Sequence, residues 1–256
     1  MSNRRLIIGG NWKMYKTPSE AASTAKALKV KLINFKDVDV VVCPPAVDLI
    51  AVNGVLQNTN IKLGGQNLHW EDEGAFTGEI SASMLTEAGC KYVIIGHSER
   101  RHVFGEKDEG INKKVLKALE KGLKPIFCIG EKLEERNAGQ TEKVVGKQVE
   151  AGLANVKITN PGDLVIAYEP VWAIGTGVNA TPEQAEEVHK FIRGLLRRFF
   201  TENLANKLCI QYGGSVKPAN AQELLGQENI DGALVGGASL DADNFTEIIK
   251  AAQKVN

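Results

Sequence analysis

The sequence predicts an α/β protein in which eight parallel strands and eight helices alternate to form a (β/α)8 barrel. Short apolar runs alternate with longer segments of helical pattern along all 256 residues. The runs are rich in Val and Ile and lack polar alternation, as expected for parallel strands that are covered on both faces. No linker or shift in composition divides the chain, so we expect residues 1–256 to form a single domain.

The apolar runs give the expected strands, which are Leu6–Gly10, Val38–Cys43, Ile61–Gly65, Tyr92–Gly96, Pro125–Gly130, Leu164–Ala167, Leu208–Tyr212 and Gly232–Val235. The segments between them give the expected helices, which are Ser19–Leu32, Ala46–Leu56, Ser81–Ala88, Ile111–Lys121, Leu133–Leu153, Pro182–Phe199, Ala219–Leu225 and Asn244–Ala252. Gly89, Gly122 and Gly226 follow three of these helices, where C-caps occur. A doubly wound open sheet has the same alternation of elements and is the alternative architecture.

Composition narrows the class of protein. The 31 basic and 31 acidic side chains cancel, which argues against binding to nucleic acid or to an anionic membrane but allows a local cationic pocket. The N-terminal apolar run is too short for a signal peptide or a transmembrane helix. Four scattered cysteines lack a C-x-x-C pair, so we expect free, mostly buried thiols in a reducing cytoplasm and no metal site or disulfide framework. They are Cys43, Cys90, Cys128 and Cys209.

The most informative segment is Val165–Gly177, in which a buried strand ends at a carboxylate, Glu169. Pro170 ends the strand because proline has no N–H to donate, and Thr181 further on fits a helix N-cap. The loop between them combines bulky apolar residues with small ones: Pro170, Val171, Trp172, Ala173, Ile174, Gly175, Thr176 and Gly177. An acid beside such a loop predicts a general base with a lid, whereas the alternative is a surface glutamate before an ordinary connection.

Polar residues follow other expected strands as well. Asn11 and Lys13 point to the same side of an extended chain, and a lysine there is costly to desolvate unless it meets an anion. His97 opens a helix, whose N-terminus disfavours imidazolium, so we expect a neutral ring that can donate a hydrogen bond to a carbonyl oxygen. The alternatives are a snorkelling lysine and a capping histidine. The other histidines lack a strand-end position and are expected to be structural: His69, His102 and His189.

Paired glycines follow the last two expected strands, in Gln211–Val216 and Leu234–Ser239. Glycines let backbone N–H groups approach an anion, and barrels of this kind often bind phosphate in the loops after strands seven and eight. Ser215, Gly236 and Gly237 are therefore expected to bind a phosphate, although two tight glycine turns would look the same.

In a barrel, the residues that follow the strands meet at one rim, where active sites are built. These residues are Asn11, Lys13, Gln66, Asn67, His97, Glu131, Glu169, Gly213, Ser215 and Gly237. The chain lacks a dinucleotide-binding fingerprint after its first strand and a carboxylate cluster suited to a metal. A base, a neutral electrophile, a cation and a phosphate cradle suit proton abstraction next to a carbonyl, with electrostatic stabilisation of the enediolate.

In these motifs the chain resembles the triosephosphate isomerase family, a standard example of a neutral catalytic histidine and a closing lid. The resemblance spans nearly the whole chain. It rests on Gly10–Met14, Gln66–Asn67, Gly74–Glu79, Tyr92–Arg101, Cys128–Glu131, Ala167–Gly177, Tyr212–Ser215 and Gly232–Ala238. Tyr15 and the Val178–Ala180 triplet depart from the commonest pattern, at positions without a chemical role.

The resemblance implies a TIM barrel that interconverts dihydroxyacetone phosphate and D-glyceraldehyde 3-phosphate in glycolysis and gluconeogenesis, without cofactor or metal. It implies a base (Glu169), an electrophile (His97), a cation (Lys13) and a polar residue that orients the substrate (Asn11). It further implies phosphate binding by Gly175, Ser215, Gly236 and Gly237, supporting roles for Ser98 and Glu99, and a cytoplasmic homodimer docked through a loop with Thr77.

Two other classes remain as alternatives. A different phosphosugar enzyme, such as an aldolase or a decarboxylating synthase, would share the phosphate loops but needs a Schiff-base lysine on a strand or a metal. A phosphate-binding regulatory barrel without activity is the other, and it is expected to have lost Lys13, His97 or Glu169, all of which are present.

Overall fold

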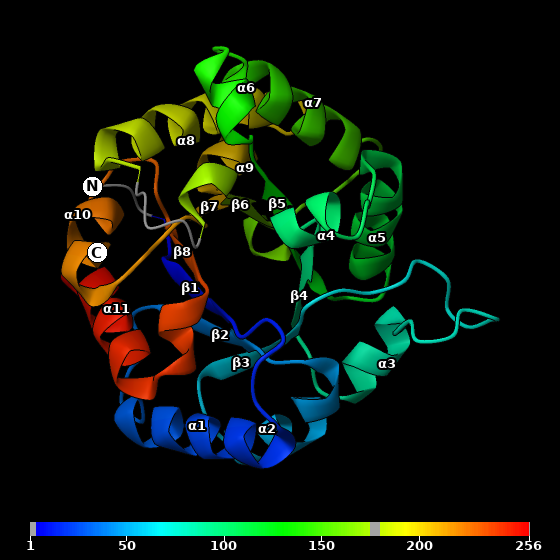
Figure 1. Cartoon of the computed structure of the whole chain (residues 1–256), viewed down its shortest axis with the longest axis vertical. Helices are drawn as coiled ribbons and strands as arrows, with labels where there is room; N and C mark the ends of the chain where they lie inside the picture. The colour runs from blue at the N-terminus through cyan, green and yellow to red at the C-terminus, as the bar shows by residue number, and fades with distance from the viewer. Residues whose placement is uncertain (1–3, 175–179, 256) are drawn as a thin grey trace.

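The computed structural model describes residues 4–174 and 180–255. Its eight parallel strands pair in sequence order, and β8 pairs with β1, which confirms the predicted closed barrel and excludes the open sheet (Figure 1). The strands are β1 (Ile7–Asn11), β2 (Asp39–Cys43), β3 (Ile61–Gly65), β4 (Tyr92–Ile95), β5 (Lys124–Ile129), β6 (Val165–Tyr168), β7 (Cys209–Tyr212) and β8 (Gly232–Val235).

Helices surround the barrel and cover the outer face of the sheet (Figure 1). The α-helices are α1 (Pro18–Lys31), α2 (Leu49–Leu56), α3 (Ala82–Glu87), α4 (Ser98–His102), α5 (Asp108–Glu120), α6 (Leu133–Asn137), α7 (Thr141–Gly152), α8 (Pro182–Leu196), α9 (Glu202–Lys207), α10 (Pro218–Leu225) and α11 (Ala242–Val255). Short 3₁₀ turns are η1 (Ala46–Asp48), η2 (Pro161–Asp163), η3 (Val171–Ala173) and η4 (Gly237–Leu240).

Element boundaries differ from the sequence prediction where local backbone geometry intervenes. The helix expected over Leu133–Leu153 is two helices, α6 and α7, because Gly139 between them has a left-handed φ of 66°. The helix expected over Pro182–Phe199 ends at Leu196, and α9 was not predicted. Among the strands, β1 and β6 each continue one residue further than expected, to Asn11 and Tyr168.

Two apolar layers make up the core. Side chains between the strands and the surrounding helices form the larger layer, and side chains inside the barrel form the smaller one, which includes Ile94, Ile126 and Val165. Three cysteines are buried and Cys209 is partly exposed, and all four are free thiols, as predicted. No helix within the described residues is long and apolar enough to cross a membrane.

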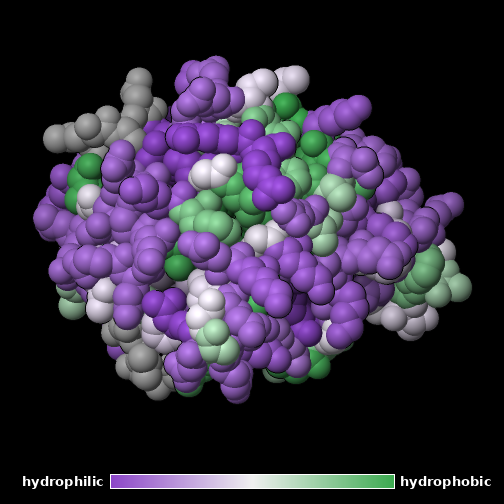
Figure 2. Space-filling view, turned by 90° about the horizontal axis from the view of Figure 1, so that it is seen from above, coloured by the Kyte–Doolittle hydropathy of each residue, from purple (hydrophilic) through white to green (hydrophobic). Residues whose placement is uncertain are grey.

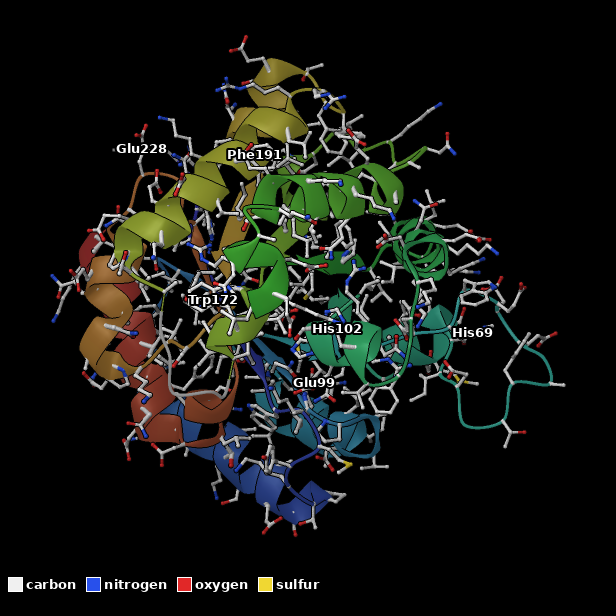
Figure 3. The ribbon with its side chains drawn as sticks, turned by 45° about the horizontal axis from the view of Figure 1, so that its top comes forward. His69, Glu99, His102, Trp172, Phe191 and Glu228 are labelled. Atoms are coloured by element: carbon white, nitrogen blue, oxygen red, sulfur yellow. The ribbon has the colours of Figure 1, made fainter. Side chains whose placement is uncertain are left out.

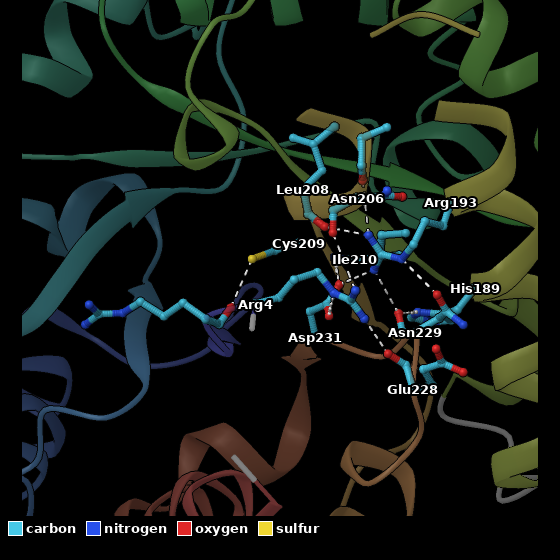
Figure 4. A network of polar contacts seen from close by, with 12 residues as sticks. Arg4, His189, Arg193, Asn206, Leu208, Cys209, Ile210, Glu228, Asn229 and Asp231 are labelled. Atoms are coloured by element: carbon cyan, nitrogen blue, oxygen red, sulfur yellow. Dashed lines mark hydrogen bonds and ion pairs between the residues drawn. The ribbon is translucent and has the colours of Figure 1, made fainter. Parts of the chain in front are cut away.

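A buried ionic network joins the amino-terminal ends of the strands (Figure 4). The Asp231 carboxylate, just before β8, bonds the guanidinium of Arg193 on α8 and lies 2.5 Å from Nε of Arg4. It also accepts a hydrogen bond of 2.9 Å from the backbone N–H of Ile210 on β7. One carboxylate therefore links the chain entering β1 to β7, β8 and α8, next to the seam where the barrel closes.

We expect Asp231→Ala to lower the free energy of unfolding by about 3–5 kcal/mol, because Arg193 would keep a buried charge without its partner. The matched control is Asp39→Ala, which removes an ion pair whose side chains are 60% (Arg5) and 32% (Asp39) exposed and should cost about 0–1 kcal/mol. Denaturant titrations at one protein concentration measure both. Equal losses of unfolding free energy in the two variants would show that the buried network stabilises the protein no more than an exposed ion pair does.

Candidate active site

The carboxylate of Glu169 lies at the end of β6, as predicted, and only 2% of the residue is exposed. Its Oε2 accepts a hydrogen bond of 2.8 Å from the backbone N–H of Ser98. The backbone amide of Glu169 donates to the carbonyl of Ile129 at 2.7 Å, which extends the pairing of β5 and β6 by one step. The strand end therefore fixes the main chain of Glu169, and the neighbouring helix start fixes its side chain.

Glycines make room for this side chain. A Cβ atom on Gly213 would lie 2.7 Å from Cγ of Glu169, and one on Gly130 would lie 1.7 Å from its carbonyl oxygen. Carbon atoms do not approach that closely, so both strands beside β6 must present glycine at this level. The glycine after β7 thus serves the acid as well as the cradle in which it was predicted.

His97 is the N-cap residue of α4, which confirms the predicted helix start. Its Nδ1 accepts a hydrogen bond of 3.2 Å from the backbone N–H of Glu99, and its Nε2 lies 2.9 Å from Oε1 of Glu169. Because Nδ1 is an acceptor, the proton of a neutral ring lies on Nε2 and is donated to Glu169. The ring is 6% exposed and faces the same cavity as the carboxylate.

Each member of this pair shifts the pKa of the other. Burial acts to raise the pKa of Glu169, but His97, the amide of Ser98 and Lys13 outweigh it and hold that pKa below its usual 4.5. Burial acts to lower the pKa of His97, whereas the carboxylates of Glu169 and Glu99 act to raise it, and in this arrangement the pKa of His97 lies above its usual 6.5. The direction of this shift runs against the neutral ring expected from the helix start, because the contact with Glu169 favours the charged form.

Asn11 is the last residue of β1, and Lys13 follows the strand on the same rim. The backbone of Lys13 has a left-handed φ of 51°, and it is held on both sides: its N–H donates to Oδ1 of Asn11 at 3.0 Å, and its carbonyl accepts from Nε2 of Gln66 at 2.8 Å. Its ammonium group lies 2.7 Å from Oε1 of Glu99. This conformation, strained for a residue other than glycine, directs a cation to the cavity beside His97.

The predicted residues enclose one cavity of about 240 Å³ at the carboxyl ends of the strands. Its lining comprises Asn11, Lys13, His97, Glu169, Ile174, Gly213, Gly214, Ser215, Val216, Lys217, Leu234, Gly236, Gly237 and Ala238. The tertiary structure thus brings together the base, histidine, cation and glycine turns expected from distant parts of the sequence. Gln66 and Asn67 line a neighbouring cavity instead, beside the loop of residues 68–81.

The described part of the predicted lid is anchored by a buried acid. Trp172, in η3, donates from Nε1 to Oε1 of Glu131 at 3.0 Å, and the hydroxyl of Tyr168 lies 3.1 Å from both oxygens of that carboxylate. Figure 3 shows Trp172 and Glu99 on the end of the barrel that faces the viewer. Pro170 and Ala173 are buried and Ile174 lines the cavity, whereas Gly175, Thr176 and Gly177 lie outside the described residues.

Sequence reasoning placed Glu131 on the rim but gave it no role, and it overlooked Lys217 as a lining residue. The position of Lys217, two residues after Ser215, was the sequence feature that could have identified it as a lining residue.

Of the histidines expected to be structural, His189 is fully buried and its pKa is lowered to about 3 by that burial. Within residues 4–174 and 180–255, no group of three or more His, Cys, Asp or Glu side chains could hold a metal ion.

Comparison with known proteins agrees with this geometry. A family model described as triosephosphate isomerase matches residues 6–252. The triosephosphate isomerase of Carboxydothermus hydrogenoformans is 56% identical over 249 residues, which is 97% of this chain and 99% of that protein. Those of Fusobacterium nucleatum subsp. nucleatum and Rhodopirellula baltica are each 52% identical, over 97% and 98% of this chain and 99% and 98% of their own lengths.

We expect Glu169→Gln to lower the pKa of His97, because the substitution removes the carboxylate charge that raises it. A ¹⁵N NMR titration of the imidazole nitrogens measures this pKa in both proteins, and above that pKa it should show a ring protonated on Nε2. His189 is the internal reference, since burial keeps it neutral in both. An unchanged His97 pKa would contradict control by Glu169, and a neutral ring protonated on Nδ1 would contradict the hydrogen bond that Nδ1 accepts from Glu99.

Proposed function

The chain belongs to the triosephosphate isomerase family, and from this premise we propose that its rim cavity interconverts dihydroxyacetone phosphate and D-glyceraldehyde 3-phosphate with the residues described below. The reaction is a step of glycolysis, and we extend it to gluconeogenesis. The observation that carries the assignment is the approach of Glu169 and His97 to 2.9 Å at one cavity that the glycine turns after β7 and β8 also line.

Glu169 acts as the base that moves a proton between C1 and C2 of the substrate. Its low pKa keeps it ionised at neutral pH, so that it can accept a proton. In the position described here its two oxygens already accept hydrogen bonds from Ser98 and His97. Moving toward the substrate breaks these contacts, and losing them raises the pKa of a desolvated carboxylate and makes it a stronger base.

His97 and Lys13 stabilise the negative charge that develops on the substrate oxygens. When Glu169 leaves Nε2 of His97, the N–H of that ring becomes free to donate to the carbonyl oxygen of the substrate. A neutral imidazole can then pass a proton between the two oxygens. The ammonium of Lys13, with Asn11 beside it, supplies the cation that balances the enediolate, and Glu99 positions that ammonium.

The phosphate is assigned to the turns after β7 and β8. Ser215, Gly236 and Gly237 line the same cavity as Glu169, and small residues in these turns leave backbone N–H groups accessible to an anion. Gly175 is proposed to add one further N–H when the lid closes. Closure over Ile174 would exclude water and hold the phosphate in the plane in which its elimination from the enediolate is disfavoured.

We expect Glu169→Gln to lower kcat by about 10²–10⁴-fold with a smaller change in KM, because the amide keeps the shape of the side chain and removes its basicity. A coupled assay of triose phosphate isomerisation, with chelator in the reaction mixture, measures both constants. Circular dichroism of the variant controls for folding. A folded variant with nearly full kcat would reassign the base.

Shortening the lid, residues 170–177, is expected to lower isomerisation and to raise the release of inorganic phosphate together with methylglyoxal. The open site exposes the enediolate to water and allows its phosphate to leave. The measurement is the number of phosphate ions released per isomerisation, compared with the intact protein at equal substrate. If the two ratios agree, the lid does not protect the intermediate.

A second copy of this chain is proposed as the partner. The loop of residues 68–81 projects from the barrel, and its residues from Glu71 to Glu79 are exposed (Figure 1). The face in Figure 2 is largely hydrophilic, but an apolar group stands out at the end where this loop projects. Exposed apolar side chains of the loop and the nearby rim need cover: Met14, Tyr15, Val47, Ile50, Phe76 and Met84. Thr77 lies in this loop, which we propose to dock beside the partner's rim in a cytoplasmic homodimer.

We expect sedimentation equilibrium to give about twice the chain mass of 27.7 kDa at micromolar concentration. Thr77→Arg places a charge in the proposed docking loop and should shift the equilibrium toward monomer. Thr159→Arg, an exposed position at the opposite end of the barrel, is the matched control. A monomer mass for the unmodified protein at that concentration rejects the dimer.

A further inference from the structure

Lys217 occupies the wall of the rim cavity on the side of the glycine turns. It follows Ser215 by two residues and lines the cavity together with Gly236 and Gly237. The residue is exposed, unlike Asn11, His97 and Glu169 at the base of the cavity. Lys217 is therefore a solvent-exposed cationic residue of the cavity lining.

The turn that presents Lys217 is held rigidly. Asn220, in the first turn of α10, accepts a hydrogen bond of 2.8 Å at Oδ1 from the backbone N–H of Lys217. The same side chain donates from Nδ2 to the carbonyl of Ser215 at 3.1 Å. One amide thus braces both the serine assigned to the phosphate and the lysine beside it, so the two keep a fixed relation at the cavity.

No carboxylate in the described residues pairs with Lys217. The remaining residues, 1–3, 175–179 and 256, include no Asp or Glu side chain. Lys13 differs in this respect, because Glu99 lies 2.7 Å from its ammonium. Lys217 is thus the cavity-lining cation whose charge no described carboxylate offsets.

The other charged groups around the cavity show why a lysine without a carboxylate partner is significant at this position. Lys13 is paired with Glu99, and His97 lies 2.9 Å from Glu169, so neither group offers an unpaired positive charge to an incoming anion. A cavity with only these groups attracts a phosphate dianion weakly as it approaches. Lys217 adds a positive charge on the side where the phosphate is assigned.

We propose that Lys217 is a recruiting cation, which draws the phosphate of the incoming substrate to the turns after β7 and β8 before the lid closes. This inference rests on the proposed function, since it assumes a phosphorylated substrate. Charges at the rim of a site act mainly on the rate of association and weaken as salt rises, because exposed charges are screened beyond roughly 10 Å at 0.1 M salt. Lys217 therefore affects kcat/KM and KM, and kcat only slightly.

The test compares Lys217→Gln, which removes the charge and keeps most of the side-chain length, with Lys217→Arg, which keeps the charge. At low salt, Lys217→Gln should lower kcat/KM for D-glyceraldehyde 3-phosphate by about three- to tenfold, and this difference should shrink as salt is added. Lys217→Arg should restore most of the loss. For D-glyceraldehyde, which lacks the phosphate, the effect should stay below about twofold. The matched control is Lys157→Gln, an exposed lysine between α7 and β6 at the opposite end of the barrel.

A second readout does not depend on turnover. The dissociation constant for inorganic phosphate, measured by calorimetry at low salt, should rise in Lys217→Gln by a factor similar to the loss in kcat/KM and remain unchanged in Lys157→Gln. An unchanged kcat/KM in Lys217→Gln overturns the proposal, and so does an equal loss with both substrates. If the unmodified protein binds inorganic phosphate but does not isomerise triose phosphates, the proposed function fails, while the phosphate titration still decides the role of Lys217.

Discussion

The parallel pairing of β8 with β1 closes the sheet, and closure forces the carboxyl ends of all eight strands onto one rim. Every functional feature of this molecule depends on that constraint. Asn11 ends the first strand and Gly237 follows the last, yet both line one cavity. At the other end of the barrel, Asp231 joins the entry to β1 with β7 and α8, so the buried ionic network reinforces the same seam.

Within the cavity, burial determines the electrostatic environment of Glu169. A carboxylate that is 2% exposed is costly to desolvate, and the Ser98 amide, the His97 ring and the nearby Lys13 offset that cost. The same contacts place the acid in a resting arrangement, because its oxygens are occupied until it moves. In the function that we propose, the side chain of Glu169 has two positions, one in which it is stabilised and one in which it acts as the base. Gly213 leaves space for the described position of the side chain, and Gly130 leaves space for the backbone of Glu169.

Electrostatic balance extends from the base of the cavity to its mouth. Lys13 is paired with Glu99 and His97 with Glu169, whereas Lys217 lines the same cavity without a described carboxylate partner. Near the start of the predicted lid, the charge of a buried acid is also compensated, since the fully buried Glu131 accepts hydrogen bonds from Tyr168 and Trp172. Glu131 therefore holds Trp172 in place through a hydrogen bond, and the next described residue of the cavity wall, Ile174, is apolar.

The sequence by itself determined the order of strands and helices, the residues that follow each strand, and the family. Buried parallel strands and helix starts such as Thr181 have local patterns that hold wherever the segment lies. Those patterns also placed Glu169, His97 and Lys13 correctly at strand ends. Only the tertiary structure decided that Ser98 donates to Glu169, that Glu131 anchors Trp172, that Asp231 bonds two arginines and that Lys217 faces the cavity. These contacts join residues far apart in the chain, and their existence depends on barrel closure and strand register, which local periodicity does not encode.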